Sequence, residues 1–401
     1  MTDLTIVGGV YIERCIQPRW DAVYGSAGRA AEAVARLVPG QITLASYIAD
    51  DTRRAAEFLA STASITLHAT PSKHSVSFDY LHPLATPTIR PVPGRIIDHN
   101  PLRVSGEVVL RYGMLEGDAI VEARTAIYDP QSAFNARRFG ANGSRADRLA
   151  ILLNRREAAS MTGLEEPKGA AEKLIHEDKA SVVVVKTGSG GALLVTPDGE
   201  VLIPAYETEH VWKIGSGDVF SATFAALWGC QGIAAEQAAD LASRATAYYC
   251  ETRTLPGLTP AELRQLSFVP RKVGAGIVYL AAPFFDIAQR WMVEEVRALL
   301  LNLGAVVFSP VHQVGPGPAE MVAPADIEGL EGAHVVFGVL NGLDAGTIFE
   351  LGYAKKKGLP IVVLAQNLKE EDLKMLAGTD CTITDDFASA IYKTIWRLPP
   401  Q

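Results

Sequence analysis

Residues 214–224 read IGSGDVFSATF, and this stretch decides the fold expected for the longer part of the chain. Three small residues, Gly215, Ser216 and Gly217, precede Asp218, which opens an apolar helix. Glycines let the backbone approach a ligand closely, and the free amide groups at a helix start attract an anion. An aspartate there can accept a proton from a hydroxyl that attacks a phosphoryl group. The alternative is a glycine-rich turn with Asp218 as N-cap, and the tetrapeptide alone leaves both interpretations open.

Other motifs favour phosphate chemistry. KTGSGG, residues 186–191, is a strand that runs into a glycine-rich turn suited to nucleotide phosphates. NRRE places Asn154 and Glu157 at i, i+3 on one helix face, where they could order a hydrated Mg²⁺. GSAGRAAEAVARL, residues 25–37, supplies a small-residue helix entry for a substrate. The order of these motifs along the chain is more informative than any one of them.

Short β-branched runs alternate with segments rich in alanine, leucine, glutamate and arginine, which predicts a mostly parallel sheet covered by helices on both faces. The expected strands are 4–7, 42–45, 108–110, 119–123, 182–186, 192–195, 277–280, 305–308, 335–340 and 361–364. The expected helices are 28–37, 53–60, 147–153, 155–162, 170–177, 218–229, 235–249, 285–303, 348–357 and 386–396. Residues 66–93 are expected to form an antiparallel hairpin that stands off the main sheet.

Length and composition narrow the class of protein. A chain of 401 residues exceeds one ordinary core, so we expect two domains, 1–270 and 276–401, joined through SFVPRKVGAG at 267–276. A formal charge of −8 argues against a nucleic-acid partner. The sequence lacks a membrane-length apolar run and a signal peptide, so no membrane association is expected. The four cysteines form no CxxC pair, which fits a reducing, cytoplasmic location.

Residues 1–268 resemble the PfkB, or ribokinase-like, family of sugar and nucleoside kinases. GSGD matches the family's GAGD signature, NRRE its N-x-x-E motif, and KTGSGG its nucleotide-binding strand and turn. The resemblance implies a ribokinase-like parallel sheet, a small β lid at 66–93, and ATP and Mg²⁺ as cofactors. It also implies roles for individual residues: Asp218 as catalytic base, Gly215, Ser216 and Gly217 as anion hole, Lys186, Thr187, Gly188 and Gly190 at the nucleotide, and Asn154 and Glu157 at the metal.

The sequence differs from this family at the positions that bind the phosphoryl acceptor. Trp212, Lys213 and Ile214 stand where the family has Asp-Thr-Thr. Glu13 and Arg29 stand near the family's substrate-binding aspartate and asparagine. The resemblance therefore implies kinase chemistry but not ribose or fructose phosphate as the substrate. The implied substrate-binding candidates are Glu13, Gly25, Gly28 and Arg29.

A second group of polar residues lies in residues 335–357, VVFGVLNGLDAGTIFELGYAKKK. A strand runs into a loop containing Asp344, and Glu350 is expected in the first turn of the helix that follows. Acidic side chains at the carboxyl end of a parallel strand lie where open α/β sheets bind ligands. The helix start is expected to keep Glu350 ionised and nucleophilic. The alternative is that both carboxylates only complement the helix dipole.

Two other stretches favour a catalytic site. YLAAPFF, residues 279–285, offers aromatic rings on which a planar base could stack. Asp326 lies ahead of the strand that leads to Asp344. Three carboxylates in one pocket would repel one another, so their pKa values should be driven apart, which yields a nucleophile and an acid from similar residues.

Residues 276–401 resemble the nucleoside 2-deoxyribosyltransferase family. Its D-x-G-x-x-x-E-x-G-x-A motif is present as Asp344, Gly346, Glu350, Gly352 and Ala354. The resemblance implies a flavodoxin- or Rossmann-like doubly wound domain that often borrows residues from a neighbouring subunit, hence a homo-oligomer. The implied roles are Glu350 as nucleophile on the anomeric carbon, Asp344 orienting it, Asp326 handling the proton of the base, and Tyr279, Phe284 and Gly346 at the substrate.

Together the two resemblances imply a bifunctional enzyme of nucleoside or nucleotide metabolism that acts on small molecules. One half would phosphorylate a sugar or nucleoside hydroxyl, and the other would make or break an N-glycosidic bond. Transfer to a second base and hydrolysis by water are not separable on these residues. The contrasting interpretation is a nucleotide-binding sensor, in which one half, preferentially the kinase half, is catalytically inactive.

Overall fold

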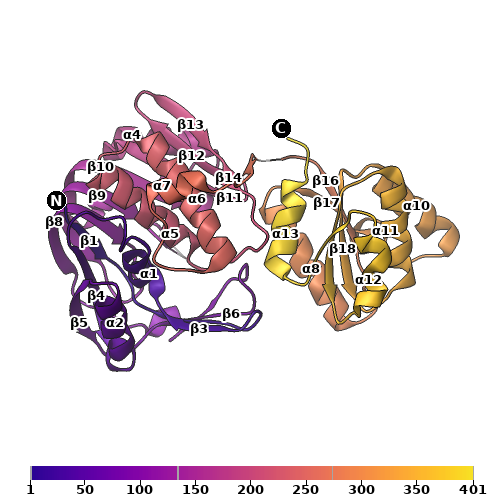
Figure 1. Ribbon diagram of the computed structural model, residues 1–401, viewed down its shortest axis with the longest axis horizontal. Helices are drawn as coiled ribbons and strands as arrows, with labels where there is room; N and C mark the ends of the chain where they lie inside the picture. The colour runs from indigo at the N-terminus through magenta and orange to yellow at the C-terminus, as the bar shows by residue number, and fades with distance from the viewer. Residues whose placement is uncertain (1, 133–134, 273, 401) are drawn as a thin grey trace. The chain divides into compact units, whose positions relative to one another are not determined.

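A computed structural model describes residues 2–132, 135–272 and 274–400 of the chain. It divides into two compact units, shown in Figure 1. Unit 1 is Met1–Thr208 with Trp212–Pro270, and unit 2 is Glu209–Val211 with Arg271–Gln401. Both units are α/β, as the alternation of strand and helix patterns predicts.

A nine-stranded sheet with the order β13-β12-β11-β10-β9-β8-β1-β4-β5 forms the centre of unit 1. The seven strands from β11 to β5 run parallel, and β12 and β13 extend the sheet as an antiparallel edge. The strands are β1 (Leu4–Val7), β4 (Ile42–Ala49), β5 (Thr66–Ser72), β8 (Leu102–Tyr112), β9 (Ala119–Asp129), β10 (Arg145–Asn154), β11 (Val182–Gly188), β12 (Gly191–Thr196) and β13 (Gly199–Ile203).

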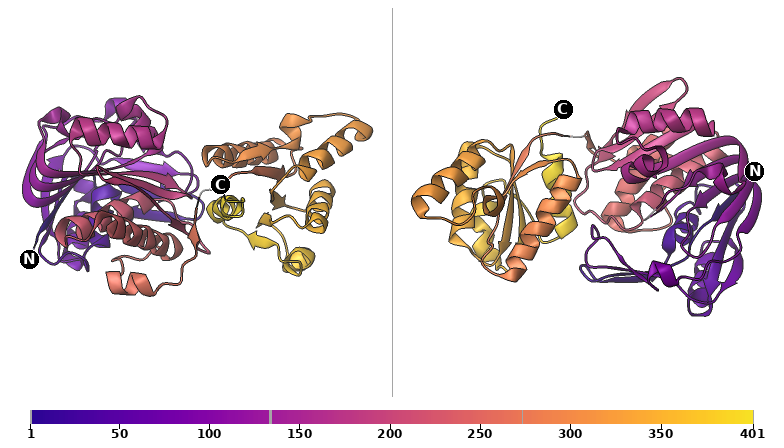
Figure 2. Two further views of the ribbon diagram at one scale, coloured as in Figure 1. Left: turned by 90° about the horizontal axis from the view of Figure 1, so that it is seen from above. Right: turned by 180° about the vertical axis from the view of Figure 1, so that it is seen from behind.

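Helices cover both faces of this sheet, which gives the three layers visible in the left view of Figure 2. One face packs against α1 (Gly25–Ala33), α2 (Asp50–Thr62), α5 (Ser216–Phe224), α6 (Ala235–Thr252) and α7 (Pro260–Gln265). The other face packs against α3 (Arg155–Thr162) and α4 (Pro167–Asp178). Strand residues alternate between the two layers: Leu152 belongs to the first core, and Ile151 and Leu153 belong to the second.

The expected helix at 147–153 is wrong. These residues lie in β10, which pairs in parallel with β9 and β11 near the middle of the sheet. The run Leu149–Leu153 is buried because helices cover both faces of the sheet. A short run that is apolar on every side has no period-2 signal, so periodicity cannot separate a central strand from a buried helix.

A smaller four-stranded sheet, β3-β2-β6-β7, forms part of unit 1. Its strands are β2 (Ile12–Cys15), β3 (Trp20–Val23), β6 (Ser77–Tyr80) and β7 (Thr88–Arg90). The hairpin expected for 66–93 is therefore correct only for β6 and β7, which are antiparallel. Residues Thr66–Ser72 instead form β5, a parallel edge strand of the main sheet. Glu13 lies on β2, so this small sheet contributes a side chain to the site described below.

Unit 2 is built on a five-stranded parallel sheet with the order β17-β16-β18-β19-β20. The strands are β16 (Ile277–Ala281), β17 (Val306–Phe308), β18 (Val335–Asn341), β19 (Ile361–Gln366) and β20 (Thr382–Thr384). The helices are α8 (Ile287–Asn302), α9 (Pro310–Gln313), α10 (Ala319–Glu331), α11 (Ala345–Lys357), α12 (Glu370–Ala377) and α13 (Phe387–Trp396). In sequence order this is a 2-1-3-4-5 doubly wound sheet, whose direction of winding reverses between β16 and β18. Ligands bind at that point in folds of this type.

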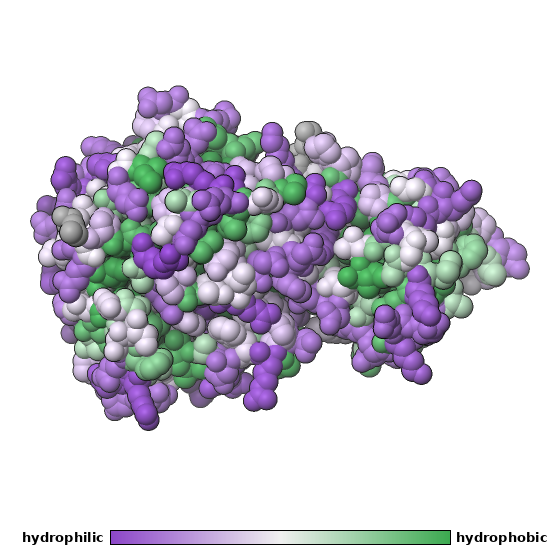
Figure 3. Space-filling model, viewed as in Figure 1, coloured by the Kyte–Doolittle hydropathy of each residue, from purple (hydrophilic) through white to green (hydrophobic). Residues whose placement is uncertain are grey.

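The remaining elements are short. They are β14 (Ala205–Tyr206), β15 (Pro270–Arg271), the 3₁₀ turns Pro93–Arg95 and Phe139–Asn142, and a π-helical segment, Ala225–Cys230, that continues α5. Hydrophilic and hydrophobic residues are interspersed on the face shown in Figure 3. Within the described ranges, none of the helices combines the length and the apolar character needed to span a bilayer.

Candidate active sites

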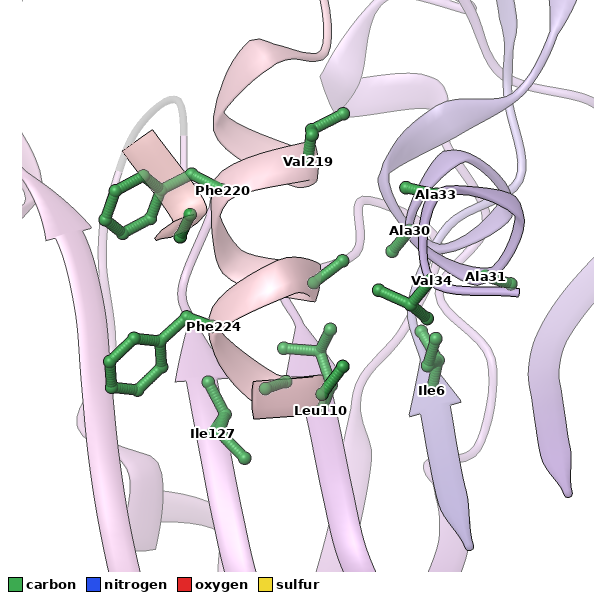
Figure 4. Close-up of a cluster of buried hydrophobic side chains, with 14 of the residues drawn as sticks. Ile6, Ala30, Ala31, Ala33, Val34, Leu110, Ile127, Val219, Phe220 and Phe224 are labelled. Atoms are coloured by element: carbon green, nitrogen blue, oxygen red, sulfur yellow. The ribbon is translucent and has the colours of Figure 1, made fainter. Parts of the chain in front are cut away.

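Helix α5 presents Asp218 and is held in place by its apolar side chains. Figure 4 shows Val219 directed toward Ala30 and Ala33 of α1, with Phe220 and Phe224 on the opposite side of α5. Phe224 is fully buried and its ring stacks on Trp228. The hydrophobic effect thus fixes the helix, and its first turn is presented at a defined position.

The turn before α5 requires glycine at one position. Gly215 is the N-cap and has a φ of 76°, a left-handed conformation that favours glycine. A Cβ built on Gly215 would lie only 2.1 Å from Nε of Arg29. This close approach brings the guanidinium of α1 against the start of α5, where Asp218 lies.

Both carboxylate oxygens of Asp218 accept hydrogen bonds. Arg29 Nη1 donates to Oδ2 over 2.9 Å, and Gln131 Nε2 donates to Oδ1 over 2.5 Å. Arg29 is fully buried and also binds both oxygens of Glu13, while its Nε donates to the hydroxyl of Tyr249 over 3.0 Å. The predicted substrate-binding residues Glu13 and Arg29 therefore lie together with Asp218, in one buried ion-pair network.

A second buried group surrounds Lys186. Its Nζ donates to Oδ2 of Asp129 over 2.5 Å, and the Ser221 hydroxyl donates to the same oxygen over 2.6 Å. Burial raises the pKa of Asp129, and the charge of Lys186 opposes this rise. Burial raises the pKa of Glu157 to about 7, and the negative charge of Asp129 adds to the increase. Asp129 was not singled out by the sequence, although it ends β9 at the carboxyl edge of the sheet.

Asn154 and Glu157 hydrogen-bond to each other's backbone amides at the start of α3. Asn154 is the N-cap of α3, its Oδ1 accepts from the Glu157 amide over 3.0 Å, and Glu157 Oε2 accepts from the Asn154 amide over 2.8 Å. This is a reciprocal capping box. Within 2–132, 135–272 and 274–400, no group of three or more His, Cys, Asp or Glu residues could hold a metal ion.

The remaining predicted residues of unit 1 lie in turns and at helix ends. The KTGSGG stretch is the hairpin between β11 and β12, where the Thr187 hydroxyl donates to the carbonyl of Gly191 over 3.0 Å. Gly25 opens α1 with a φ of 59°, and a Cβ there would meet the Gly9 carbonyl at 2.5 Å. Gly28 lies within α1, where a Cβ would make only ordinary contacts.

In unit 2, Asp344 and Glu350 occupy other positions in helix α11 than the sequence predicts. Helix α11 begins at Ala345, three residues earlier than predicted, and Asp344 is its N-cap. Asp344 Oδ2 accepts from the amide and the hydroxyl of Thr347, each over 2.7 Å. Glu350 is therefore the sixth residue of the helix, beyond the first turn, where the helix dipole has little effect. Asp344 caps the helix rather than binding Glu350.

Tyr279 holds Glu350. Its hydroxyl donates to Oε1 of Glu350 over 2.7 Å, and its fully buried ring stacks on Phe308 with a centroid separation of 5.4 Å. Burial raises the pKa of Glu350 to about 7, the Tyr279 hydrogen bond lowers it, and the charges of Asp326 and Asp344 add to the increase. The helix start therefore does not set the ionisation of Glu350 as expected, because Glu350 lies beyond the first turn and burial raises its pKa.

Asp326 has an unsatisfied oxygen. It lies on α10, a helix that the sequence did not predict, and its Oδ1 is shielded from solvent without a hydrogen-bond partner among the described residues. Burial raises the pKa of Asp326. Of the other predicted residues, Phe284 is half-buried and stacks on Phe285, and Gly346 is exposed in the first turn of α11.

Two family profiles match this chain. Residues 149–254 match the pfkB family of carbohydrate kinases, and residues 278–384 match nucleoside 2-deoxyribosyltransferase. Over 108 residues the chain is 32% identical to an ATP-dependent ribose-1-phosphate kinase of Halopiger xanaduensis. That match covers 27% of this chain and 34% of the relative, so the chain spans about a third of the length of this curated protein.

Solved structures similar to the chain include a nucleoside kinase of Methanocaldococcus jannaschii, with 15% identity over 66% of this chain and 97% of that one, and a TM-score of 0.49. Another is the fructokinase of Vibrio cholerae O395, with 15% identity over 66% of this chain and 98% of that one, and a TM-score of 0.48. The two profile matches cover separate parts of the chain: the pfkB match lies in unit 1 apart from Glu209–Val211, and the deoxyribosyltransferase match lies in unit 2. The protein thus joins a PfkB-like part to a nucleoside 2-deoxyribosyltransferase-like part.

Proposed function

We propose that the protein is a bifunctional enzyme acting on nucleoside- or sugar-type small molecules. Unit 1 would transfer a phosphoryl group from ATP to a hydroxyl, and unit 2 would break or exchange an N-glycosidic bond. The observation that carries the proposal is the hydrogen bond between Tyr279 and Glu350, next to the reversal point of a doubly wound sheet. The two family matches and the kinase relative support the same pair of chemistries.

In unit 2 the carboxylate of Glu350 is positioned to attack an anomeric carbon. Tyr279 orients it and favours its ionised form through the hydrogen bond. The orphaned Oδ1 of Asp326 supplies an acceptor for a base N–H group, or, when protonated, a donor to a base nitrogen. Attack by Glu350 would release the base and leave a glycosyl-enzyme, which a second base or water would then resolve.

A mechanism-based label tests this assignment. A nucleoside with fluorine at C2′ slows both steps and should leave a sugar attached to the peptide that contains Glu350. Glu350→Gln should abolish labelling and lower turnover by at least about 10³-fold, while Glu328→Gln, a matched change at an exposed residue of α10, should label normally. Cleavage by Glu350→Gln at the wild-type rate would exclude this residue as the nucleophile.

In unit 1 we assign Asp218 as the group that accepts the proton of the attacking hydroxyl. Arg29 and Gln131 each donate to one of its oxygens, so an acceptor hydroxyl must use a remaining lone pair or displace one of these donors. For Mg²⁺, the carboxylate of Glu157, with Asn154 beside it, would contact an ion that is held mainly by phosphates and water. The ion would neutralise charge on the transferring phosphoryl group.

A second candidate function is favoured by the same ion pair. Because Arg29 fills the space beside Asp218 and is saturated by Glu13, unit 1 could bind a nucleotide without turnover and regulate the other half. A phosphorylation assay with the full chain distinguishes the two functions. ATP binding without any phosphorylated product, across a panel of sugars and nucleosides, would favour the regulatory function.

We also propose that unit 2 forms a homo-oligomer. Large apolar side chains are exposed around the ends of its strands and on α10 and α11, among them Met321 (70% exposed), Phe349 (64%) and Leu343 (57%). Isolated apolar residues are ordinary, but these stand in the segments that carry Asp326, Asp344 and Glu350, which favours a covering surface there. A monomeric mass in solution at micromolar concentration would contradict this. The four described cysteines are free, which supports a reducing, cytoplasmic location.

A further inference from the structure

Lys213 is an uncompensated cation beside the first turn of α5. Its Nζ donates to the Ser216 hydroxyl over 2.7 Å, and its side chain is mostly buried. Among the residues that the structure describes, no carboxylate forms an ion pair with it. The groups that influence its charge are Cys250 on α6, Lys186 on β11 and Asp218 on α5. Burial lowers the pKa of Lys213, which is the expected response of an ammonium that lacks an anionic partner.

A second ammonium lies at the same helix start. Lys186 Nζ is 3.8 Å from the position that a Cβ on Gly217 would take. Lys186 is balanced by its ion pair with Asp129, whereas Lys213 has only the neutral hydroxyl of Ser216. The two amines therefore flank the first turn of α5, and one of the two positive charges is not compensated.

The helix start adds to this positive potential. Helix α5 is nine residues long, and its N-cap Gly215 has no side chain to cap the first amide groups. The amides and the helix dipole favour an anion at this point. Because Lys213 donates to Ser216, the hydroxyl proton of Ser216 is free to donate in turn. The Ser216 amide donates to the Lys213 carbonyl over 3.1 Å, so the donors that converge here are the ammonium, the Ser216 hydroxyl and the next amides, of Gly217 and Asp218.

We infer that Lys213 is a phosphate-binding residue which, with Ser216 and Lys186, holds the terminal phosphates of the phosphoryl donor in unit 1. A buried cation is unfavourable unless it is paired, and a phosphate carries the charge and the acceptor oxygens that this group lacks. The inference rests on the proposed phosphoryl transfer and deepens it, because it assigns donor binding to a residue outside the GSGD motif. The same chemistry would suit the phosphate of a phosphorylated acceptor, so the test separates the two sources.

The test is titration calorimetry on the full-length chain with ADP·Mg²⁺, inorganic pyrophosphate and ribose 1-phosphate as probes. Lys213→Met should weaken ADP and pyrophosphate binding by about tenfold or more, whereas Lys213→Arg, which keeps the charge, should stay within about threefold. Lys168→Met, which removes an exposed ion pair with Glu200, is the matched control and should bind as wild type. Ribose 1-phosphate binding should be unchanged in all three variants.

Thermal unfolding without ligand separates binding from a structural role. Removal of an uncompensated buried charge should leave the melting temperature of Lys213→Met equal to or above that of wild type. A folded Lys213→Met that binds pyrophosphate as tightly as wild type would overturn the inference, as would a loss confined to ribose 1-phosphate. Pyrophosphate binding that depends on Lys213 in a protein without any phosphorylated product would contradict the proposed kinase activity and leave this site standing.

Discussion

At the scale of single residues, Glu350 is subject to opposing influences. Burial and the neighbouring charges of Asp326 and Asp344 disfavour its ionised form, and the Tyr279 hydroxyl favours it. The result is a pKa of about 7 instead of the usual 4.5. A carboxylate whose pKa lies near neutral pH is reactive once it is ionised, because little solvating water must be removed when it attacks.

This balance predicts a gain in stability when Glu350 is neutralised. A carboxyl whose pKa is raised on folding stabilises the native state fully below about pH 4.5, and this contribution is lost as pH rises through 7. Glu350→Gln should therefore raise the free energy of unfolding by about 1–3 kcal/mol at pH 8 and change it little near pH 4.5. Urea unfolding of both proteins at the two pH values measures this. A gain of equal size at both would mean that burial of charge is not the cause.

Several contacts between single residues could not be predicted from the sequence. Glu13 and Arg29 were singled out through the resemblance, but the ion pair of Arg29 with Asp218 joins positions 189 residues apart and depends on the packing of α1 against α5. Tyr279 was expected at the substrate, and the hydrogen bond of its hydroxyl to Glu350 was not predicted. Asp129 carried no motif, because its role depends on Lys186 reaching it from a neighbouring part of the sheet.

At the scale of elements, the order of strands and helices was largely predictable, and the exceptions have physical causes. The strand β10 was expected as a helix because it is apolar on both faces. Helix α10 was missed because Pro324 and Gly329 lie inside it and interrupt its pattern. Helix α11 begins earlier than expected because Asp344 caps it, which displaces Glu350 from the first turn.

Two glycines at the start of α5 allow a prediction about stability, in which a change at Gly217 is the control for a change at Gly215. Gly215→Ala would introduce a Cβ 2.1 Å from Arg29 at a φ of 76°, so we expect a loss of about 2 kcal/mol or more in the free energy of unfolding. Gly217→Ala would meet only Lys186 Nζ at 3.8 Å, an ordinary contact, and should be near neutral in stability. Chemical denaturation compares the two variants with wild type. Equal losses in both would show that the left-handed backbone and the contact with Arg29 are not the cause.

At the scale of the whole molecule, the division into two units falls after Pro270, within the proposed linker, but it is not a simple cut in sequence. Residues Glu209–Val211 belong to unit 2. There the Val211 amide donates to the Ser389 hydroxyl over 2.9 Å, and the buried ammonium of Lys393 binds Glu209. Composition and turn residues can indicate a linker, but a short return of the chain into another unit leaves no periodic pattern.

Because residues 209–211 belong to unit 2, cutting the chain between the units should affect the stability of the C-terminal fragment. We expect residues 1–270 and 271–401 to fold separately, since each unit has its own sheet and core. The second fragment should be less stable than unit 2 in the intact chain, because Lys393 loses Glu209 and Ser389 loses its backbone donor. The intact chain, in which residues 209–211 stay covalently joined to unit 2 and both contacts are kept, is the control. Aggregation of both fragments would contradict separate folding.

The central claim is that one chain carries two chemistries at two sites. The most direct measurement is product analysis by mass after incubation of the full chain with nucleosides and nucleotides, with and without ATP, for wild type, Asp218→Asn and Glu350→Ala. The account predicts an ATP-dependent phosphorylated product and a released base from wild type. Asp218→Asn should lose only the first, by about 10²–10⁴-fold, and Glu350→Ala should lose only the second. Retention of both products by both variants, or loss of both through either change, would contradict the account.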